Sequence, residues 1–131
     1  MRRRSTWFTV SSWVFAGLFT ICVALQLNDP DPIRWMMIYG AAAVASVLVP
    51  SWRHGWLLAV LVGSLAAVWA GWLWGQVVGY VAIDDLWLKM SEKGGKVEEM
   101  REAGGLTIVT LWMATAALFG WLGTREARRT P

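Results

Sequence analysis

The residues of this chain that could bind a cation or take part in catalysis are mainly acids, and they lie in two short segments. Eight of its nine Asp and Glu residues lie within residues 28–34 and 81–105, and the ninth is Glu126. Carboxylate and amide oxygens are the ligands that hard cations such as calcium and magnesium prefer. If the two segments meet in space, they form a polar cluster or ligand-binding site from the following residues: Gln26, Asn28, Asp29, Asp31, Glu98, Glu99, Arg101 and Glu102.

A divalent cation at this cluster would be held by the carboxylates of Asp29, Asp31, Glu98 and Glu102. Glu98 and Glu102 stand four residues apart on one helical face, where like charges cost about 0.2–0.5 kcal/mol, and the neighbouring Arg101 can offset that repulsion. The alternative to a metal site is a solvated charged loop with Glu98–Arg101 and Arg101–Asp29 pairs. We predict that Asp29 or Asp31 pairs directly with Arg101, because turn formation alone leaves the side chain of Asp29 without a role.

Several kinds of membrane chemistry are excluded by the residue types of the apolar stretches. The ionisable residues of the four charge-free stretches are Cys22 and the tyrosines Tyr39 and Tyr80, whereas proton relays and ion-coupled transporters place carboxylates, histidine or lysine at mid-membrane. One histidine cannot form a bis-histidine haem site, and no lysine within a span could form a retinal Schiff base. A Ser-His-Asp triad cannot assemble either, because His54 and every acid except Glu126 are expected on opposite sides of the bilayer.

Four apolar stretches must position the polar segments. Residues 7–27, 35–49, 56–83 and 106–123 contain no Asp, Glu, Lys, Arg or His, and about 20 apolar residues cross a hydrocarbon core as a helix. The composition, 56% hydrophobic and 16% charged, is too apolar for an ordinary soluble domain. We therefore predict an all-α, polytopic membrane protein, with residues 1–131 forming one four-helix transmembrane bundle whose helices span about 7–27, 32–49, 56–80 and 106–123.

The arginines predict the orientation of the bundle. Seven of the nine occur before the first helix, in the loop after the second and in the C-terminal tail, as Arg2, Arg3, Arg4, Arg53, Arg125, Arg128 and Arg129. Four spans place these segments on one side, which the positive-inside rule makes cytoplasmic. Both termini are thus expected in the cytoplasm, the acidic segments are expected to be exoplasmic, and the bacterial inner membrane is the expected location.

The connections between helices carry their own signals. The stretch NDPDP predicts a tight turn, because each proline disfavours helical backbone at the residue before it and Asp31 with Pro32 suits the start of the second helix. The third loop is expected to hold short interfacial helical segments at DDLWLKM and KVEEMREAGG. Gly104 and Gly105 should then either separate the latter segment from the fourth helix or bend it into that helix.

The third helix carries a stripe of small residues with four-residue spacing: Gly63, Ala67, Gly71, Gly75 and Gly79. Such a face lets another backbone approach closely in a membrane. We predict that it is a helix-packing face, buried against the second helix of the same chain or against a neighbouring subunit.

Two segments resemble the transmembrane protein 220 family of small multi-pass membrane proteins. They are LQLNDPDPIRWMMIYG and EEMREAGGLTIVTLWM, and the second motif is the weaker of the two alone. The resemblance implies family membership, a four-span plan and a joint role for the two polar segments, and it supplies no mechanism. The matching positions are Gln26, Asn28, Asp29, Pro30, Asp31, Trp35 and Tyr39, followed by Glu98, Glu99, Arg101, Glu102, Gly105, Leu106 and Trp112.

These features favour a non-enzymatic membrane protein, an accessory or binding subunit with an exoplasmic polar cluster. The alternative is a metal-assisted enzyme acting on lipid headgroups at the outer interface, and a pore ranks third because one small bundle cannot line it. The expected partners are membrane lipids, with a homo-oligomer or a larger membrane complex left open, and no nucleic acid is expected.

Overall fold

The computed structural model describes residues 5–89 and 91–130 of the chain. Its long helices are α1 (Thr6–Leu25), α2 (Pro32–Ser51), α3 (Gly55–Val77) and α4 (Lys96–Ala127), and its 3-10 helices are η1 (Gln26–Asn28), η2 (Ile83–Trp87) and η3 (Glu92–Gly95). All four long helices are long and apolar enough to cross a membrane. The predicted all-α, multi-pass architecture is therefore confirmed. Arg2, Arg3 and Arg4, on which part of the predicted orientation depends, lie outside the described residues.

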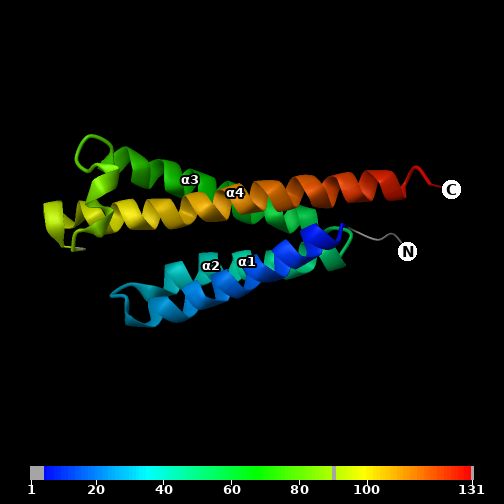
Figure 1. The fold of residues 1–131 in the computed structure, drawn as a ribbon, viewed down its shortest axis with the longest axis horizontal. Coiled ribbons are helices and arrows are strands. Elements are labelled where there is room, and N and C mark those ends of the chain that lie inside the picture. Colours follow the sequence, from blue (N-terminus) through cyan, green and yellow to red (C-terminus); the bar gives the residue numbers. More distant parts are fainter. Residues whose placement is uncertain (1–4, 90, 131) are drawn as a thin grey trace.

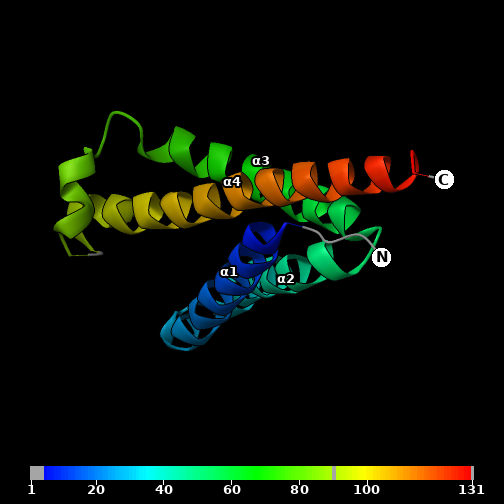
Figure 2. The same ribbon diagram turned by 45° about the vertical axis from the view of Figure 1, so that its right-hand side comes forward.

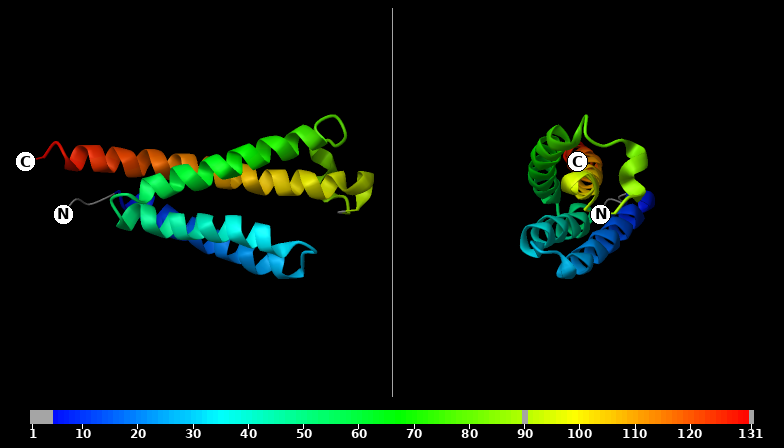
Figure 3. Two further views of the ribbon diagram at one scale, coloured as in Figure 1. Left: turned by 180° about the vertical axis from the view of Figure 1, so that it is seen from behind. Right: turned by 90° about the vertical axis from the view of Figure 1, so that its left-hand side faces the viewer.

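The four helices form two hairpins, α1 with α2 and α3 with α4 (Figure 1). The start of α1 and the end of α4 lie at the same end of the bundle, as an even number of spans requires. The hairpins approach each other at that end and diverge toward the other, as two further directions of view also show (Figures 2 and 3). The α1–α2 turn and the segment between α3 and α4, which carry the acids, share this diverging end; below it is called the outer end.

The fourth helix begins ten residues earlier than the predicted span. It runs without a break through Gly104 and Gly105 for 32 residues, about 48 Å at 1.5 Å per residue, whereas a hydrocarbon core is about 30 Å thick. The charge-free part of α4 starts at Ala103, directly after Glu102, so residues 96–102 extend beyond the apolar part of the helix. A glycine inside a helix costs about 1 kcal/mol, but Gly105 has a packing role, because a Cβ there would collide with the Tyr39 hydroxyl of α2.

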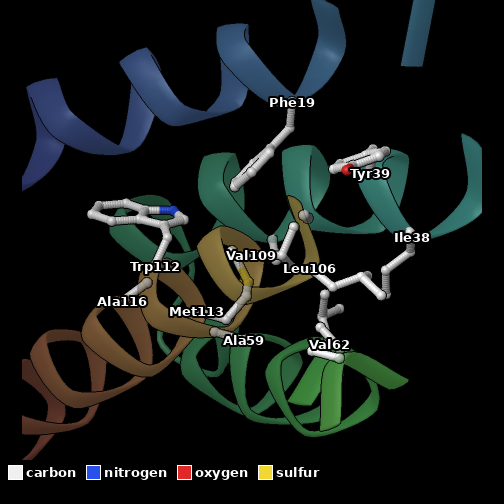
Figure 4. Close-up of a cluster of buried hydrophobic side chains, with 14 of the residues drawn as sticks. Phe19, Ile38, Tyr39, Ala59, Val62, Leu106, Val109, Trp112, Met113 and Ala116 are labelled. Atoms are coloured by element: carbon white, nitrogen blue, oxygen red, sulfur yellow. The ribbon is translucent and has the colours of Figure 1, made fainter. Parts of the chain in front are cut away.

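Small and branched apolar residues fill the centre of the bundle, where α4 packs most closely on α3 (Figure 4). The Trp112 ring of α4 stacks on Phe15 of α1 with ring centroids 4.2 Å apart, and its Nε1–H donates to Ser46 Oγ of α2 over 2.9 Å. One residue thus joins three helices. The buried positions of α3 and α4 include Ala59, Val62, Ala66, Ala70, Leu73, Ala103, Leu106, Val109, Met113 and Ala116.

The predicted helix-packing stripe of α3 is not the face that the chain buries. Ala67, Gly71 and Gly75 are exposed, and a Cβ built at Gly71 or Gly75 would meet no atom within 4 Å. Gly79 lies beyond the end of α3 at a φ of +89°. Gly63 packs against α4, where a Cβ would lie 2.9 Å from Met113 Cβ, and Ala67 lines a groove beside the same helix. The buried face of α3 is turned by one residue from this stripe and carries Ala59, Val62, Ala66, Ala70 and Leu73.

Candidate functional site

The turn between α1 and α2 holds Asp29 in place. After η1 the backbone of Asp29 is extended, and one of its carboxylate oxygens, Oδ1, accepts a hydrogen bond from the Asp31 N–H over 2.9 Å. Asp31 is the N-cap residue of α2 and Pro32 begins that helix, as NDPDP predicts. The expectation that the turn leaves Asp29 without a role is wrong, because this local bond closes the turn and engages one of the two oxygens.

The first turns of α4 bring two more carboxylates to that turn. Glu98 and Glu102 lie on one face of the helix, and each of Asp29, Glu98 and Glu102 offers an oxygen within 4.8 Å of the others. All three side chains are partly buried. We call these three residues the outer carboxylate cluster. Sequence positions 29 and 98 are thus adjacent in space, as the hypothesis of a joint polar site requires.

A cavity of about 370 Å³ opens beside the cluster at the outer end of the bundle. Trp35 is 2% exposed, and its ring stacks on Trp69 of α3 with centroids 4.5 Å apart, so the inner wall is aromatic. The acids therefore face a pocket that is apolar on one side and charged on the other. The complete lining is Asp29, Pro30, Asp31, Arg34, Trp35, Trp69, Trp72, Leu73, Gly95, Glu98, Glu99 and Glu102.

The electrostatics of the cluster concentrate on Glu102, which lies in the part of α4 outside the membrane span. Burial and then the negative charge of Glu98 raise the pKa of the Glu102 carboxyl to about 7, with further raising contributions from Asp29 and Glu99. Arg34 opposes this shift but does not cancel it. At neutral pH the Glu102 carboxyl is therefore only partly ionised, and a bound cation would favour its charged form.

The predicted pairing of Arg101 with Asp29 or Asp31 is wrong. The Arg101 Nε–H donates to the carbonyl oxygen of Leu86 over 2.9 Å, and its Nη2–H donates to that of Leu88 over 2.8 Å and also to Leu86. Arg101 thus lies on the side of α4 that faces η2. Its guanidinium holds the third loop against α4 by satisfying backbone carbonyls at the end of η2.

The cation that the sequence interpretation missed is Arg34, in the first turn of α2. Its Nε lies 2.9 Å from Asp31 Oδ2, and both side chains are more than half exposed. The guanidinium carbon also lies 5.5 Å and 5.8 Å from the ring centroids of Trp35 and Trp69. The signal for this pair is present in the sequence, because Asp31 and Arg34 are three residues apart on a helix that starts at Pro32.

The remaining predicted site residues divide between the cavity wall and other roles. Glu99 lines the cavity, but its Oε2 accepts from Lys96 Nζ over 3.0 Å. Gln26 and Asn28 form η1 and are not among the described residues that line the cavity. Of the four carboxylates proposed as metal ligands, Asp31 is the one outside the cluster. In the described part of the chain, no Lys or Arg forms an ion pair with Asp29, Glu98 or Glu102.

Comparison with known proteins agrees with this architecture. The profile of a family described as "Transmembrane family 220, helix" matches residues 18–118. A Xenopus laevis protein named Transmembrane protein 220 is 29% identical over 120 residues, which cover 85% of this chain and 58% of the frog protein. No solved structure matches the chain. Because the family profile extends over most of the chain and over both polar segments, this four-span membrane protein belongs to the transmembrane protein 220 family.

Proposed function

We propose that this protein is a non-enzymatic binding or accessory subunit of a membrane, and that its outer carboxylate cluster holds a cationic ligand. Calcium and magnesium are the first candidates, because the cluster offers oxygen ligands only. The observation that carries the proposal is the approach of one oxygen from each of Asp29, Glu98 and Glu102 to within 4.8 Å of the others. Two oxygens bound about 2.3–2.6 Å from one calcium ion lie at most about 5 Å apart, so the spacing suits a shared ion.

The charge balance supports the same proposal. Arg101 is engaged by the carbonyl oxygens of the third loop, and Arg34 is paired with Asp31 at the rim of the cavity. Neither guanidinium is ion-paired with the cluster in the described chain. A bound cation would supply the missing positive charge and would allow Glu102 to ionise at neutral pH.

An enzyme acting on lipid headgroups is the second candidate that the sequence leaves open, and the cavity favours it less. Its described lining contains no serine, threonine, cysteine, histidine or lysine, so the carboxylates are the only side chains there that could act as a nucleophile or a general base. In the metal-assisted form of this candidate, hydrolysis would use water activated by a metal at the outer carboxylate cluster. This reaction depends on the same cation that the binding proposal invokes.

The proposed orientation places both termini in the cytoplasm and the outer end in the exoplasmic space. Its support is the separation of charge along the bundle, with Arg53, Arg125 and Arg128 at one end and the outer carboxylate cluster at the other. The related frog protein is eukaryotic and does not favour the bacterial inner membrane. The proposal also includes assembly with partners, either as a homo-oligomer or within a larger membrane complex.

The test is a thermal unfolding titration of the purified chain in detergent with calcium and magnesium chloride, and with choline chloride at matched ionic strength. We expect a divalent cation to raise the Tm by several degrees, because a ligand at 100 times its Kd contributes about 2.7 kcal/mol. Asp29→Asn and Glu102→Gln should remove most of this shift. Asp84→Asn, an exposed acid of the third loop outside the cavity, is the matched control and should keep it. Equal shifts in all four chains, or none in the wild type, would exclude the cation site.

A further inference from the structure

A second cavity, of about 160 Å³, lies at the opposite end of the bundle from the acids. It is formed by the α2–α3 loop, the first turn of α3 and the last turns of α4. Three arginines and the single histidine meet there, and every described lining residue is basic, aromatic or a threonine. The complete lining is Arg53, His54, Trp56, Trp121, Thr124, Arg125 and Arg128.

Close helix packing builds this cavity. A Cβ at Gly120 of α4 would lie 2.8 Å from Trp56 Cβ and 2.9 Å from Val49 Cγ1, so glycine there lets α4 approach the end of α2 and the start of α3. This contact brings the last turns of α4, which carry Arg125 and Arg128, beside the loop that carries Arg53. Residues more than 70 positions apart in sequence therefore enclose one pocket.

The charges of this pocket are unbalanced. The guanidinium of Arg125 lies over the Trp121 ring at 4.6 Å from its centroid, and the His54 ring meets Trp52 edge-on at 5.8 Å. No carboxylate is among the described residues that line the pocket; Glu126, the nearest acid in sequence to Arg125, is not one of them. Guanidinium groups held close together without an acid favour an anion, and their planar donors match phosphate oxygens.

The position of the pocket relative to the membrane surface indicates the source of the anion. Trp56 and Trp121 form part of its wall, and indole rings at helix ends lie at the level of lipid headgroups. The apolar parts of α3 and α4 begin directly beside the pocket, so a bound phosphate would sit at the membrane surface. Basic pockets between helix ends on the arginine-rich side of a membrane bind the headgroups of anionic lipids.

We propose that this pocket binds the phosphate of an anionic glycerophospholipid. Arg53 reaches the phosphate from the α2–α3 loop and Arg128 from the end of α4, while Arg125 stays on Trp121 and adds its charge. The acyl chains of the lipid remain in the bilayer beside α3 and α4. This site is separate from the outer carboxylate cluster, so either proposal can fail without the other.

The experiment measures lipid retention by native mass spectrometry of the full chain, released from detergent micelles with phosphatidylglycerol or phosphatidylcholine. We expect the wild type to retain phosphatidylglycerol preferentially, and Arg53→Gln and Arg128→Gln each to weaken retention about fivefold, as the loss of one basic contact with an anionic lipid surface predicts. Arg129→Gln is the matched control, since Arg129 is exposed, adjacent in sequence and outside the described lining. The Tm of each variant in phosphatidylcholine alone checks that it folds.

Three results would overturn the proposal. The first is equal retention of phosphatidylglycerol and phosphatidylcholine by the wild type. The second is an equal effect of Arg128→Gln and Arg129→Gln, because net charge would then explain the retention without a pocket. The third is full competition by glycerol 3-phosphate at concentrations equal to the lipid, which would assign the pocket to a soluble anion. Arg128→Lys, which keeps the charge and loses the planar donor set, should retain an intermediate amount of lipid.

Discussion

At the residue scale, one carboxylate determines how the outer end responds to pH. The side chain of Glu102 faces Glu98 and Glu99 from its own helix, and Asp29 and Arg34 from the other hairpin. Burial and the three acids raise the pKa of Glu102 more than Arg34 lowers it. The pKa of Glu102 in the folded state is therefore about 7, above the usual value of 4.5. A group whose pKa rises on folding binds more protons when folded, so the free energy of unfolding decreases as pH rises between these two values.

We therefore expect the chain to be most stable near pH 5 and to lose stability up to about pH 8. After solvent screening of a half-exposed group the loss should be about 1 kcal/mol. Glu102→Gln should flatten this dependence and exceed the wild type in Tm at pH 8, whereas Asp84→Asn should follow the wild type. Thermal unfolding in detergent at pH 5 to 8, without divalent cations, measures the effect. A wild type whose Tm rises over this range would contradict the assigned sign.

At the element scale, neighbouring helices decide which face of a helix is buried. Gly71 and Gly75 of α3 have no neighbouring atom within 4 Å of a Cβ built on them. Ala66 and Ala70, on the adjacent face of the same helix, are buried. In α4 a single glycine has the opposite role, because Gly105 gives room for the Tyr39 hydroxyl. The importance of a glycine in this bundle therefore depends on its neighbour and not on a four-residue spacing.

Two substitutions distinguish a glycine that packs against a neighbouring helix from one that has no neighbour in the described chain. Gly105→Ala should lower the free energy of unfolding by about 1–3 kcal/mol, because the added methyl group overpacks the contact with Tyr39. Gly71→Leu should change it by less than about 0.5 kcal/mol, since the new side chain meets lipid. Thermal unfolding and light scattering of the detergent-solubilised chain check stability and oligomeric state together. A Gly71→Leu chain that loses stability or dissociates would show that a second subunit covers this face.

At the scale of the whole molecule, charge is separated between the two ends. The hairpins diverge at one end of the bundle and converge at the other (Figure 1). The outer carboxylate cluster and Arg34 lie at the first of these ends, and the arginine-lined pocket lies at the second. Because basic loops are retained in the cytoplasm, this asymmetry supports the proposed orientation. The cavity beside the acids is then expected at the exoplasmic leaflet, and the arginine-lined pocket at the cytoplasmic leaflet.

Labelling of single added cysteines tests the orientation. We expect a membrane-impermeant maleimide added outside intact cells to label Lys89→Cys and to leave Arg53→Cys unlabelled until the cells are broken. Both positions are exposed in the structure. The wild-type chain, whose one cysteine is Cys22 within α1, measures the background. The reverse labelling pattern would invert the bundle, and labelling of both positions from outside would contradict the four-span plan.

The number of spans, their approximate limits and the gathering of eight of the nine acids at one end could be predicted from the sequence. These properties follow from the one-dimensional rules of membrane insertion, namely the length of an apolar stretch and the placement of arginine. The approach of Asp29 to Glu98 and Glu102 could also be predicted, because four spans return both acidic segments to one end of the bundle.

The partners of the charged side chains depend on tertiary packing and could not be predicted from the sequence. Arg101 faces the third loop and Arg34 faces the cavity because the rotation of α4 and α2 about their axes is determined by packing throughout the bundle. The uninterrupted passage of α4 through Gly104 and Gly105, the burial of Trp35 and the exposure of Gly71 have the same cause. In each case a local pattern allowed more than one helix face or backbone path, and contacts with residues distant in sequence selected among them.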